Sequence, residues 1–554
     1  MAGTGVVRGI APAPADDPLE VVFAYHTATK HGFHAYARGP GQLDWANQPD
    51  PFRRYTGAPL FPLDRVPPTD QPLYEPAFLR GQVPAAPLNR AGISQLFFDS
   101  LSLSAWKEAG ESRWALRVNP SSGNLHPTEG YLICGPVDGL SDGAGIYHYA
   151  PKEHALELRA RLSAEQWAAL SASFPPGTLF VGFTSIHWRE AWKYGQRAYR
   201  YCQHDVGHAL GALAIAAAGL GWEARLLDDL GMEELAQLFG VPAPGEVEAE
   251  HPDCLIAIFP ADAPVTASGF PPGAILGLTQ LSWQGRPNQL SPEHVDWHLE
   301  PVAEATTKPH TEAAFEPYRS PFPALAWESS PVHLRRIIRQ RRSAVAMDAH
   351  TGITQAALYQ MLWKTLAGPD QVPFLTLPWR PHVHLLLFVH RVQGLDPGLY
   401  FLVRDPTQLD TLRAALDPSF VWEKPADCPE GMELFRLVTG DARRVAAQVS
   451  CGQDIAADGC FSLAMLAEFE GPLRRSGPWF YPRLYWECGL IGQVLYLEAE
   501  ASGIRATGIG CFFDDPVHEL LGLQDRAYQD LYHFTVGGAV EDRRLSTLPA
   551  YPGE

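Results

Sequence analysis

The pattern of apolar and polar positions repeats in the two halves of the chain. Amphipathic helices are predicted at ISQLFFDSLSLSAW, from Ile93, and at ITQAALYQMLWKTL, from Ile353, because apolar residues recur there at helical spacing. Long buried helices are predicted at DVGHALGALAIAAAGLG, from Asp205, and at ECGLIGQVLYLEAEASG, from Glu487. Both are apolar on most faces and each runs into a glycine stop. These matching segments indicate that one structural unit occurs twice.

Further segments extend the repeat. A short strand, a turn and a helix are predicted for YHYAPKEHALELRARL, from Tyr147, and for YFLVRDPTQLDTLRAAL, from Tyr400. The long helices are followed by DDLGMEELAQLFGV and DDPVHELLGL, which predict two similar helices capped by acidic residues. LFVGFTS, HVHLLLFVH and LIAIFPA are typical of buried strands. The expected fold class is α+β, with a mixed or antiparallel sheet flanked by helices in each half.

Proline-rich stretches suggest the domain boundaries. Residues 1–90 are irregular and are predicted to wrap the surface, and residues 263–330 predict an extended linker. Residues 91–262 and 331–554 then form two tandem domains. Fusion of a homodimer would produce such a chain, so we expect an intramolecular pseudo-dimer. Further dimerisation of the fused chain stays open.

Composition narrows the function classes. The 554 residues carry a formal net charge of −19, which argues against a nucleic-acid partner. The chain shows no signal peptide and no apolar run of about 18 residues, so a cytoplasmic protein without a membrane partner is expected. The eight cysteines form no CxxC pair, and ordinary buried thiols are predicted, with Cys451 and Cys460 the nearest pair in sequence.

The strongest basic cluster lies in LRRIIRQRRSAV. Five of the eight residues from Arg335 to Arg342 are arginines, and the helix is expected to end near Arg341, Arg342 and Ser343. Guanidinium forks beside a hydroxyl suit a phosphate group. A solvated basic helix face is the alternative.

Two other segments combine small residues with hydrogen-bond donors. VNPSSGNLHPTE, residues 118–129, lets the backbone approach a ligand at its glycine, although an Asx or Ser turn explains it equally. GIRATGIGCFFDD is interpreted as a connection between helices that either packs on a ligand or is a plain turn. The candidate residues are Pro120, Ser121, Ser122, Gly123 and Asn124 in the first segment, and Gly508, Gly510 and Cys511 in the second.

Lys193 and Tyr194 adjoin in the aromatic, basic stretch HWREAWKYGQRAYRYCQHD. A lysine in such a setting can have a lowered pKa and act as a base, whereas a half-buried helix with snorkelling cations is the plainer interpretation. Histidines gather at residues 26–34 and 382–390, but no carboxylate or cysteine completes a zinc pattern, so no metal is predicted.

Together these motifs resemble the nitroreductase superfamily of FMN-dependent oxidoreductases. Arg341, Arg342 and Ser343 resemble its phosphate-binding residues, and NPSSGNLHPTE resembles its Pro-Ser-Ser loop facing the flavin. GIGCFFDDPVHELLGL resembles its turn beside the isoalloxazine, and VGGAVEDRR, with Arg544, its closing strand and phosphate-side basic residue. WKYGQRAYRY resembles the lysine–tyrosine motif of SagB/ThcOx-type dehydrogenases, which oxidise azolines in peptides to azoles.

The departures from the family pattern are complementary. The first half has no RRS before Ile93, and the second half has PDQVPFLTLPWRP where a Pro-Ser-Ser loop is expected. The family builds its flavin site across a dimer interface. The resemblance therefore implies a single composite FMN site per chain, shared by the two halves.

The activity implied by the resemblance is hydride transfer via flavin N5. The substrate would be a small molecule or a peptide, with NAD(P)H or O2 as candidate redox partner, and Lys193 and Tyr194 would handle a proton in a SagB-type reaction. Two alternatives stay open: an NAD(P)H-dependent nitro or quinone reductase, and a flavin-binding or degenerate scaffold in a peptide-modifying complex.

Overall fold

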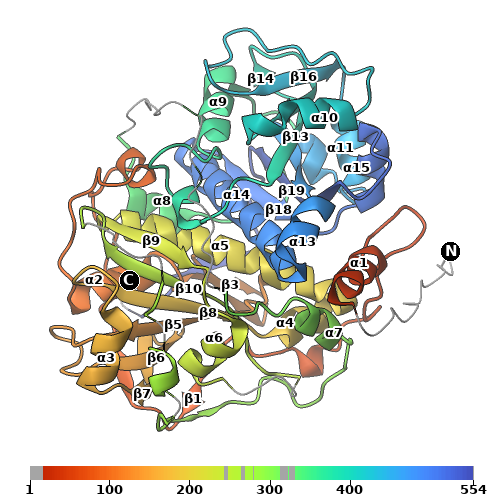
Figure 1. The fold of residues 1–554 in the computed structure, drawn as a ribbon. Helices are drawn as coiled ribbons and strands as arrows, with labels where there is room; N and C mark the ends of the chain where they lie inside the picture. Colours follow the sequence, from red (N-terminus) through yellow and green to blue (C-terminus); the bar gives the residue numbers. More distant parts are fainter. Residues whose placement is uncertain are drawn as a thin grey trace.

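Two antiparallel sheets organise the protein (Figure 1). The computed structural model describes residues 17–241, 247–263, 269–271, 273–278, 280–311, 318, 322 and 331–552. The first sheet has, in spatial order, β2 (Leu60–Pro62), β7 (Ala155–Arg161), β6 (Gly145–Ala150), β5 (Thr128–Cys134), β8 (Leu179–Ser185), β10 (His251–Pro260) and β9 (Trp222–Leu227). The second has β16 (Leu434–Thr439), β15 (Gly398–Leu402), β13 (Val383–Val389), β17 (Phe461–Glu468), β19 (Tyr528–Gly537) and β18 (Arg505–Ile509).

The two sheets share one topology. If the six strands from β7 to β9, and those from β16 to β18, are numbered along the chain, both sheets have the spatial order 3-2-1-4-6-5. The strands predicted at LFVGFTS, HVHLLLFVH and LIAIFPA correspond to β8, β13 and part of β10. The repetition expected from the sequence is therefore visible in the strand order, and the α+β fold class is confirmed.

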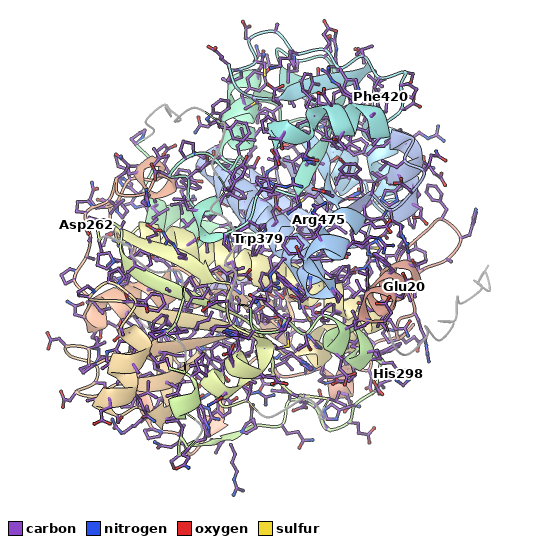
Figure 2. The ribbon with its side chains drawn as sticks, in the orientation of Figure 1. Glu20, Asp262, His298, Trp379, Phe420 and Arg475 are labelled. Atoms are coloured by element: carbon purple, nitrogen blue, oxygen red, sulfur yellow. The ribbon has the colours of Figure 1, made fainter. Side chains whose placement is uncertain are left out.

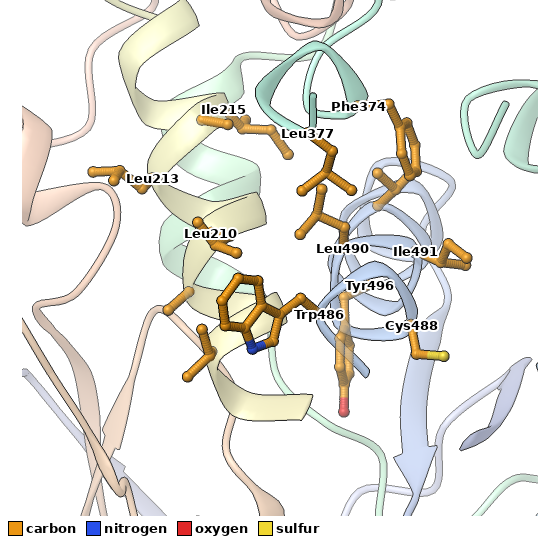
Figure 3. Close-up of a cluster of buried hydrophobic side chains, with 14 of the residues drawn as sticks. Leu210, Leu213, Ile215, Phe374, Leu377, Trp486, Cys488, Leu490, Ile491 and Tyr496 are labelled. Atoms are coloured by element: carbon orange, nitrogen blue, oxygen red, sulfur yellow. The ribbon is translucent and has the colours of Figure 1, made fainter. Parts of the chain in front are cut away.

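Two long helices, α5 (Ala198–Ala218) and α14 (Tyr481–Ala501), cross between the sheets (Figure 1). Every residue of α5 is buried, as its continuous apolar pattern predicts. Leu210 of α5 lies opposite Trp486 and Leu490 of α14 in the shared core (Figure 3). Trp379, near the middle of the molecule, is also buried (Figure 2).

The remaining elements surround this frame. The helices are α1 (Pro18–Ala28), α2 (Arg90–Phe98), α3 (Ala164–Ser171), α4 (His187–Tyr194), α6 (Met232–Phe239), α7 (Glu300–Ala305), α8 (Leu334–Gln340), α9 (Gln355–Trp363), α10 (Leu409–Ala415), α11 (Arg443–Val449), α12 (Ile455–Asp458), α13 (Glu470–Ser476) and α15 (Asp514–Leu521). The remaining strands are β1 (Tyr55–Thr56), β3 (Leu103–Ala109), β4 (Ser112–Arg117), β11 (Arg286–Pro287), β12 (Ile353–Thr354), β14 (Val392–Gln393) and β20 (Ser546–Leu548). Because β20 pairs with β3, the C-terminal segment lies against the first half (Figure 1).

Two sequence-based predictions of secondary structure were wrong, and a third holds only in part. The helix expected after Tyr147 is the strand β7, in which Leu156 and Leu158 both face a core, although Ala, Leu, Glu and Arg favour helices. The helix from Ile93 ends at Phe98, and the following residues form β3. GIRATGIG lies between α14 and α15 as expected, but it contains the strand β18 (Arg505–Ile509) and is not a plain turn.

Two further expectations hold only in part. The N-caps of α6 and α15 are Gly231 and Phe513 and not acidic residues. Acidic side chains still lie in both first turns, where they complement the helix dipole, and these are Glu233 and Glu234 in α6 and Asp514 and Asp515 in α15. Residues 17–90 are not only a surface wrap, since Tyr74 and Phe78 are fully buried. The expected linker contains β11 and α7, while residues 264–268, 272, 279, 312–317, 319–321 and 323–330 lie outside the described residues. In the described part of the chain, no helix is both long and apolar enough to cross a membrane.

Candidate functional site

A cavity of about 500 Å³ lies where segments of both halves meet, a volume in the range of small-molecule sites. Its walls come from the serine loop (residues 119–126), the arginine segment (residues 341–343), β18 with the residues that follow it, and the helices α5 and α14. Of the site residues expected from the sequence, the structure brings together Pro120, Ser121, Ser122, Gly123, Asn124, Tyr194, Arg341, Arg342, Ser343, Gly508, Gly510 and Cys511.

The serine loop is a turn fixed by hydrogen bonds. Ser122 donates to Asp205 from its backbone nitrogen at 3.0 Å and from its hydroxyl at 3.1 Å. The backbone nitrogen of His126 donates to Ser121 Oγ at 2.8 Å. Gly123 and Asn124 have φ angles of 59° and 61°, in the left-handed region that glycine and asparagine tolerate best. The loop is therefore both the turn that its composition predicts and a wall of the cavity.

Asp205 of α5 anchors this loop from inside the protein. Burial raises the pKa of Asp205 to about 7, although the hydrogen bonds from Ser121 and Ser122 act in the opposite direction. Because Asp205 also lines the cavity, a carboxyl group that titrates near neutrality lies at the wall.

Arg341 lines the cavity and has hydrogen-bond donors that no described residue accepts. It directly follows the end of α8, where the sequence predicts that the helix stops. Its side chain is buried, and Nη2 donates to the carbonyl oxygen of Arg117 at 3.2 Å. Its Nε and Nη1 find no hydrogen-bond partner among the described residues. Buried donors without partners are costly, so this side chain is arranged for an acceptor that the protein itself does not supply.

The charges around Arg341 reinforce this arrangement. Burial, together with repulsion from Arg341, lowers the pKa of Arg342 to about 10. Burial also lowers the pKa of Arg117 to about 10. Within the described residues neither Arg341 nor Arg342 forms an ion pair, whereas Arg505, which lines the same cavity as Lys107, lies 3.6 Å from Glu500 and 3.5 Å from Glu541. A bound anion would offset this excess of positive charge.

Ser343 is held beside the glycine-containing strand. Its hydroxyl lies 2.9 Å from the hydroxyl of Tyr496, which also accepts a hydrogen bond from the backbone nitrogen of Gly508 at 3.0 Å. The guanidinium carbon of Arg341 lies 4.9 Å from the centre of the Tyr496 ring, within cation–π range. Tyr496 therefore links the arginine segment to β18.

The glycines after Arg505 leave room for tyrosines of the protein. A Cβ atom added to Gly508 would lie 2.7 Å from Cζ of Tyr532, and one added to Gly510 would overlap the ring of Tyr201. Both tyrosines line the cavity. Packing inside the protein thus explains both glycines without a ligand, while their backbone still borders the cavity.

Lys193 and Tyr194 end α4 and lie against the serine loop. A Cβ atom added to Gly123 would lie 2.6 Å from Tyr194 Oη and 3.0 Å from Lys193 Nζ. Tyr194 lines the cavity, whereas Lys193 lies behind Gly123 and is not part of the lining. Burial raises the pKa of Tyr194 well above its usual range, so its phenol stays protonated and can donate a hydrogen bond.

Arg544 does not reach the cavity. Its side chain is 87% exposed and forms a 2.7 Å ion pair with Asp542. The sequence-based expectation that it lies at a phosphate site is therefore corrected, because its local carboxylate holds it at the surface. The lining residues that sequence reasoning missed include Tyr201, Asp205, His208, Tyr496 and Tyr532. For the residues of α5 and α14, the available signal was polar and aromatic side chains within helices that were expected to be buried on most faces.

A second group of segments from both halves packs together and leaves little space. Segments 79–81, 221–224 and 372–376 line a space of only about 10 Å³, enough for about one water molecule. Arg80 pairs with Asp370 at 2.5 Å, and the backbone nitrogen of Val372 donates to the carbonyl oxygen of Phe78 at 3.0 Å. The segment that stands where a second Pro-Ser-Ser loop would lie thus packs directly on the segment before α2.

The histidines of β13 and its ends have protein partners. His382 lies 3.1 Å from Glu468, His384 accepts a hydrogen bond from the backbone nitrogen of Arg404, and His390 contacts the carbonyl oxygen of Ala456. Among the described residues no group of three or more histidine, cysteine or acidic side chains is arranged to hold a metal ion.

Comparison with known proteins identifies the fold. Residues 107–258 match the nitroreductase family. A crystal structure described as a nitroreductase from Anabaena variabilis ATCC 29413 matches at a TM-score of 0.67 and 21% identity, covering 94% of this chain and 99% of that one. No curated protein sequence matches the chain.

Two other solved structures resemble smaller parts. One, described as a nitroreductase from Ralstonia eutropha JMP134, has a TM-score of 0.28 at 15% identity and covers 42% of this chain and 97% of that one. The other is the E. coli microcin synthetase McbBCD complex with truncated pro-MccB17 bound, with a TM-score of 0.27 at 16% identity, covering 44% of this chain and 82% of that one. Residues 107–258 therefore match a nitroreductase-family domain, and the chain has the nitroreductase fold.

Proposed function

We propose that the protein is an FMN-dependent oxidoreductase that binds one FMN per chain in the cavity between its halves. The observation that carries this proposal is the buried Arg341, which lines the same cavity as the serine loop and whose Nε and Nη1 have no partner among the described residues. The topology repeated in both sheets supports two domains, residues 91–262 and 331–554, as a fused pseudo-dimer.

The residues around the cavity fit the chemical parts of FMN. Arg341, Arg342 and Ser343 would hold the phosphate, since forked cationic donors and a hydroxyl are what a phosphate needs. The serine loop and the backbone at Gly508 and Gly510 would border the ring. When bound, FMN supplies hydride transfer at its N5 atom, and the protein supplies binding, orientation and electrostatics.

One site per chain is proposed because the equivalent space is closed. The approximately 10 Å³ left between residues 79–81 and 372–376 does not admit a nucleotide. The Arg80–Asp370 ion pair further occupies the position where phosphate donors would be needed.

For the chemistry we assign a proton relay to Tyr194 and Lys193. Tyr194 lines the cavity, and its Oη can pass a proton from a substrate to Lys193 Nζ, since both atoms lie against Gly123. This is the step that a SagB-type dehydrogenase would require of the chain, with a small molecule or a peptide as substrate. Asp205 holds the serine loop in place meanwhile.

A nitro or quinone reductase using NAD(P)H is the second candidate. Lys107 favours it, because this lysine adds positive charge to the cavity beyond the arginine segment and suits a phosphate of a nicotinamide cofactor. Rapid loss of flavin absorbance on addition of NADPH would select this candidate over the SagB-type reaction.

The decisive experiment is a visible spectrum with a count of bound flavin. We expect a yellow protein that releases one FMN per chain. Two FMN per chain would overturn the single site. A protein that stays colourless after FMN addition would overturn the flavin proposal and favour a scaffold role. Arg443→Ala, which removes an exposed arginine paired with Asp441, should release the same one FMN per chain.

A further inference from the structure

Two cysteines from separate segments meet at the edge of the cavity. The sulfur atoms of Cys451 and Cys511 lie 2.8 Å apart. Both thiols are free and partly exposed, and Cys511 lines the cavity. The sequence pairs Cys451 most closely with Cys460, but Cys460 is buried and its sulfur lies 3.3 Å from the carbonyl oxygen of Thr351. The fold therefore creates a cysteine pair that sequence spacing does not reveal.

Hydrogen bonds on both sides of the pair hold its two segments together. Gln453 Nε2 donates to the carbonyl oxygen of Cys511 at 2.8 Å. The backbone nitrogen of Phe513 donates to the carbonyl oxygen of Val449 at 2.7 Å. A disulfide bond is about 2.05 Å long, so the sulfurs need to approach by less than about 1 Å to form one. Such a movement lies within the reach of side-chain rotation and leaves the anchors in place.

The environment of this pair differs from that of the other cysteines. The hydrogen bond between the two thiols lowers the pKa of Cys511 and raises that of Cys451, and the nearby guanidinium of Arg197 lowers the pKa of Cys511 further. Asp514 opposes this effect, and burial does so as well. By contrast, burial raises the pKa of the Cys134 thiol to about 12. Because the thiolate is the reactive form, Cys511 is the nucleophile of the pair.

We propose that Cys451 and Cys511 form a redox-active dithiol that exchanges with small-molecule disulfides at the wall of the cavity. The thiolate of Cys511 attacks one sulfur of a disulfide RSSR, which forms a mixed disulfide and releases RS⁻. Cys451 then loses its proton and attacks Cys511 Sγ, which forms the protein disulfide and releases a second RS⁻. The dithiol is oxidised by two electrons, RSSR is reduced to two RSH, and the two thiol protons end on the released RSH.

Formation of the Cys451–Cys511 disulfide would change the wall of the cavity. Cys511 follows Gly510, whose carbonyl oxygen accepts a hydrogen bond from Tyr201 at 2.9 Å. Tying Cys511 to the segment after α11 would fix this part of the wall, while the reduced pair leaves it free to adjust. The proposal does not depend on what the cavity binds.

The test uses the full-length protein, reduced and then incubated with oxidised glutathione. We expect the loss of two titratable thiols, a peptide pair linked through Cys451 and Cys511 in mass spectra, and full recovery with dithiothreitol. Cys451→Ser should trap a glutathione adduct on Cys511, because no second thiol resolves it. Cys428→Ser, which removes a partly exposed cysteine from another segment, should still lose two thiols.

Two results would overturn the proposal. One is an unchanged thiol count together with an unmodified Cys511 in Cys451→Ser. The other is a glutathione adduct that persists equally in the wild type and in Cys451→Ser. The thiols are counted both with and without added FMN. The thiol count therefore tests the dithiol even if the protein binds no flavin.

Discussion

Gly207 of α5 and Gly489 of α14 meet where the two long helices cross, so closely that a Cβ atom added to Gly489 would lie 2.6 Å from Gly207 Cα. This crossing brings the two halves together at the cavity, since α5 carries Asp205 and α14 carries Tyr496. Backbone contact of this kind leaves no flexible side chain that could move aside.

Gly489→Ala should therefore destabilise the protein and disturb the cavity together. We expect a loss of about 1–3 kcal/mol in the free energy of unfolding, as in overpacked cores. Urea denaturation measures it, with Gly39→Ala as control, because a Cβ atom there meets nothing within 4 Å. Equal midpoints for the two variants would contradict the close crossing.

Replacement of Arg341 separates ligand binding from stability. Arg341→Met should weaken FMN binding by roughly 10- to 100-fold, because a charge-assisted hydrogen bond is worth about 1.5–3 kcal/mol. Without ligand, the same change should leave stability equal or higher, since it removes a buried charge with unpartnered donors. Fluorescence titration and thermal melts measure the two effects, and Arg443→Met serves as the exposed control. A large loss of stability without ligand would assign Arg341 a structural role instead.

Sequence reasoning finds those parts of the site whose conformation is determined by neighbouring residues in the chain. The end of α8 at the arginine segment and the turn at Gly123 follow from helix stops and turn chemistry, which act over a few residues. The meeting of both segments at one cavity follows from their resemblance to a family, and not from periodicity or spacing.

What sequence reasoning misses depends on tertiary contacts. Leu156 and Leu158 are buried by their sheet, which overrides the helical preference of their neighbours. The Cys451–Cys511 pair joins positions 60 residues apart. Asp205 looks like one polar residue at the start of an apolar helix, and only the hydrogen bonds from Ser122 reveal its role.

Asp205 should make stability depend on pH. Burial raises its pKa to about 7 in the folded protein, against an ordinary value of about 3.9 when unfolded. The folded state thus holds the proton more tightly, so the stabilisation is complete below about pH 4 and is lost as the pH rises through 7. The three-unit difference corresponds to at most about 4 kcal/mol.

Asp205→Asn should remove this part of the pH dependence, because its amide cannot ionise. Denaturant unfolding between pH 4 and pH 8 measures the difference from the wild type. The control is Asp262→Asn, at an exposed position on the surface (Figure 2). If the slopes of stability against pH agree between Asp205→Asn and the wild type, Asp205 does not titrate in this range.

The proton relay predicts different effects at two neighbouring residues. Tyr194→Phe removes the hydroxyl of a residue that lines the cavity, and Lys193→Ala removes the amine that lies beside that hydroxyl against Gly123. Each should lower kcat by about 10²- to 10⁴-fold, the usual contribution of a positioned proton-transfer group, while the FMN content stays unchanged. A loss of kcat at unchanged FMN content distinguishes this role from a structural one. Variants with full activity would refute the relay, and variants without bound FMN would show instead that the two side chains support the serine loop.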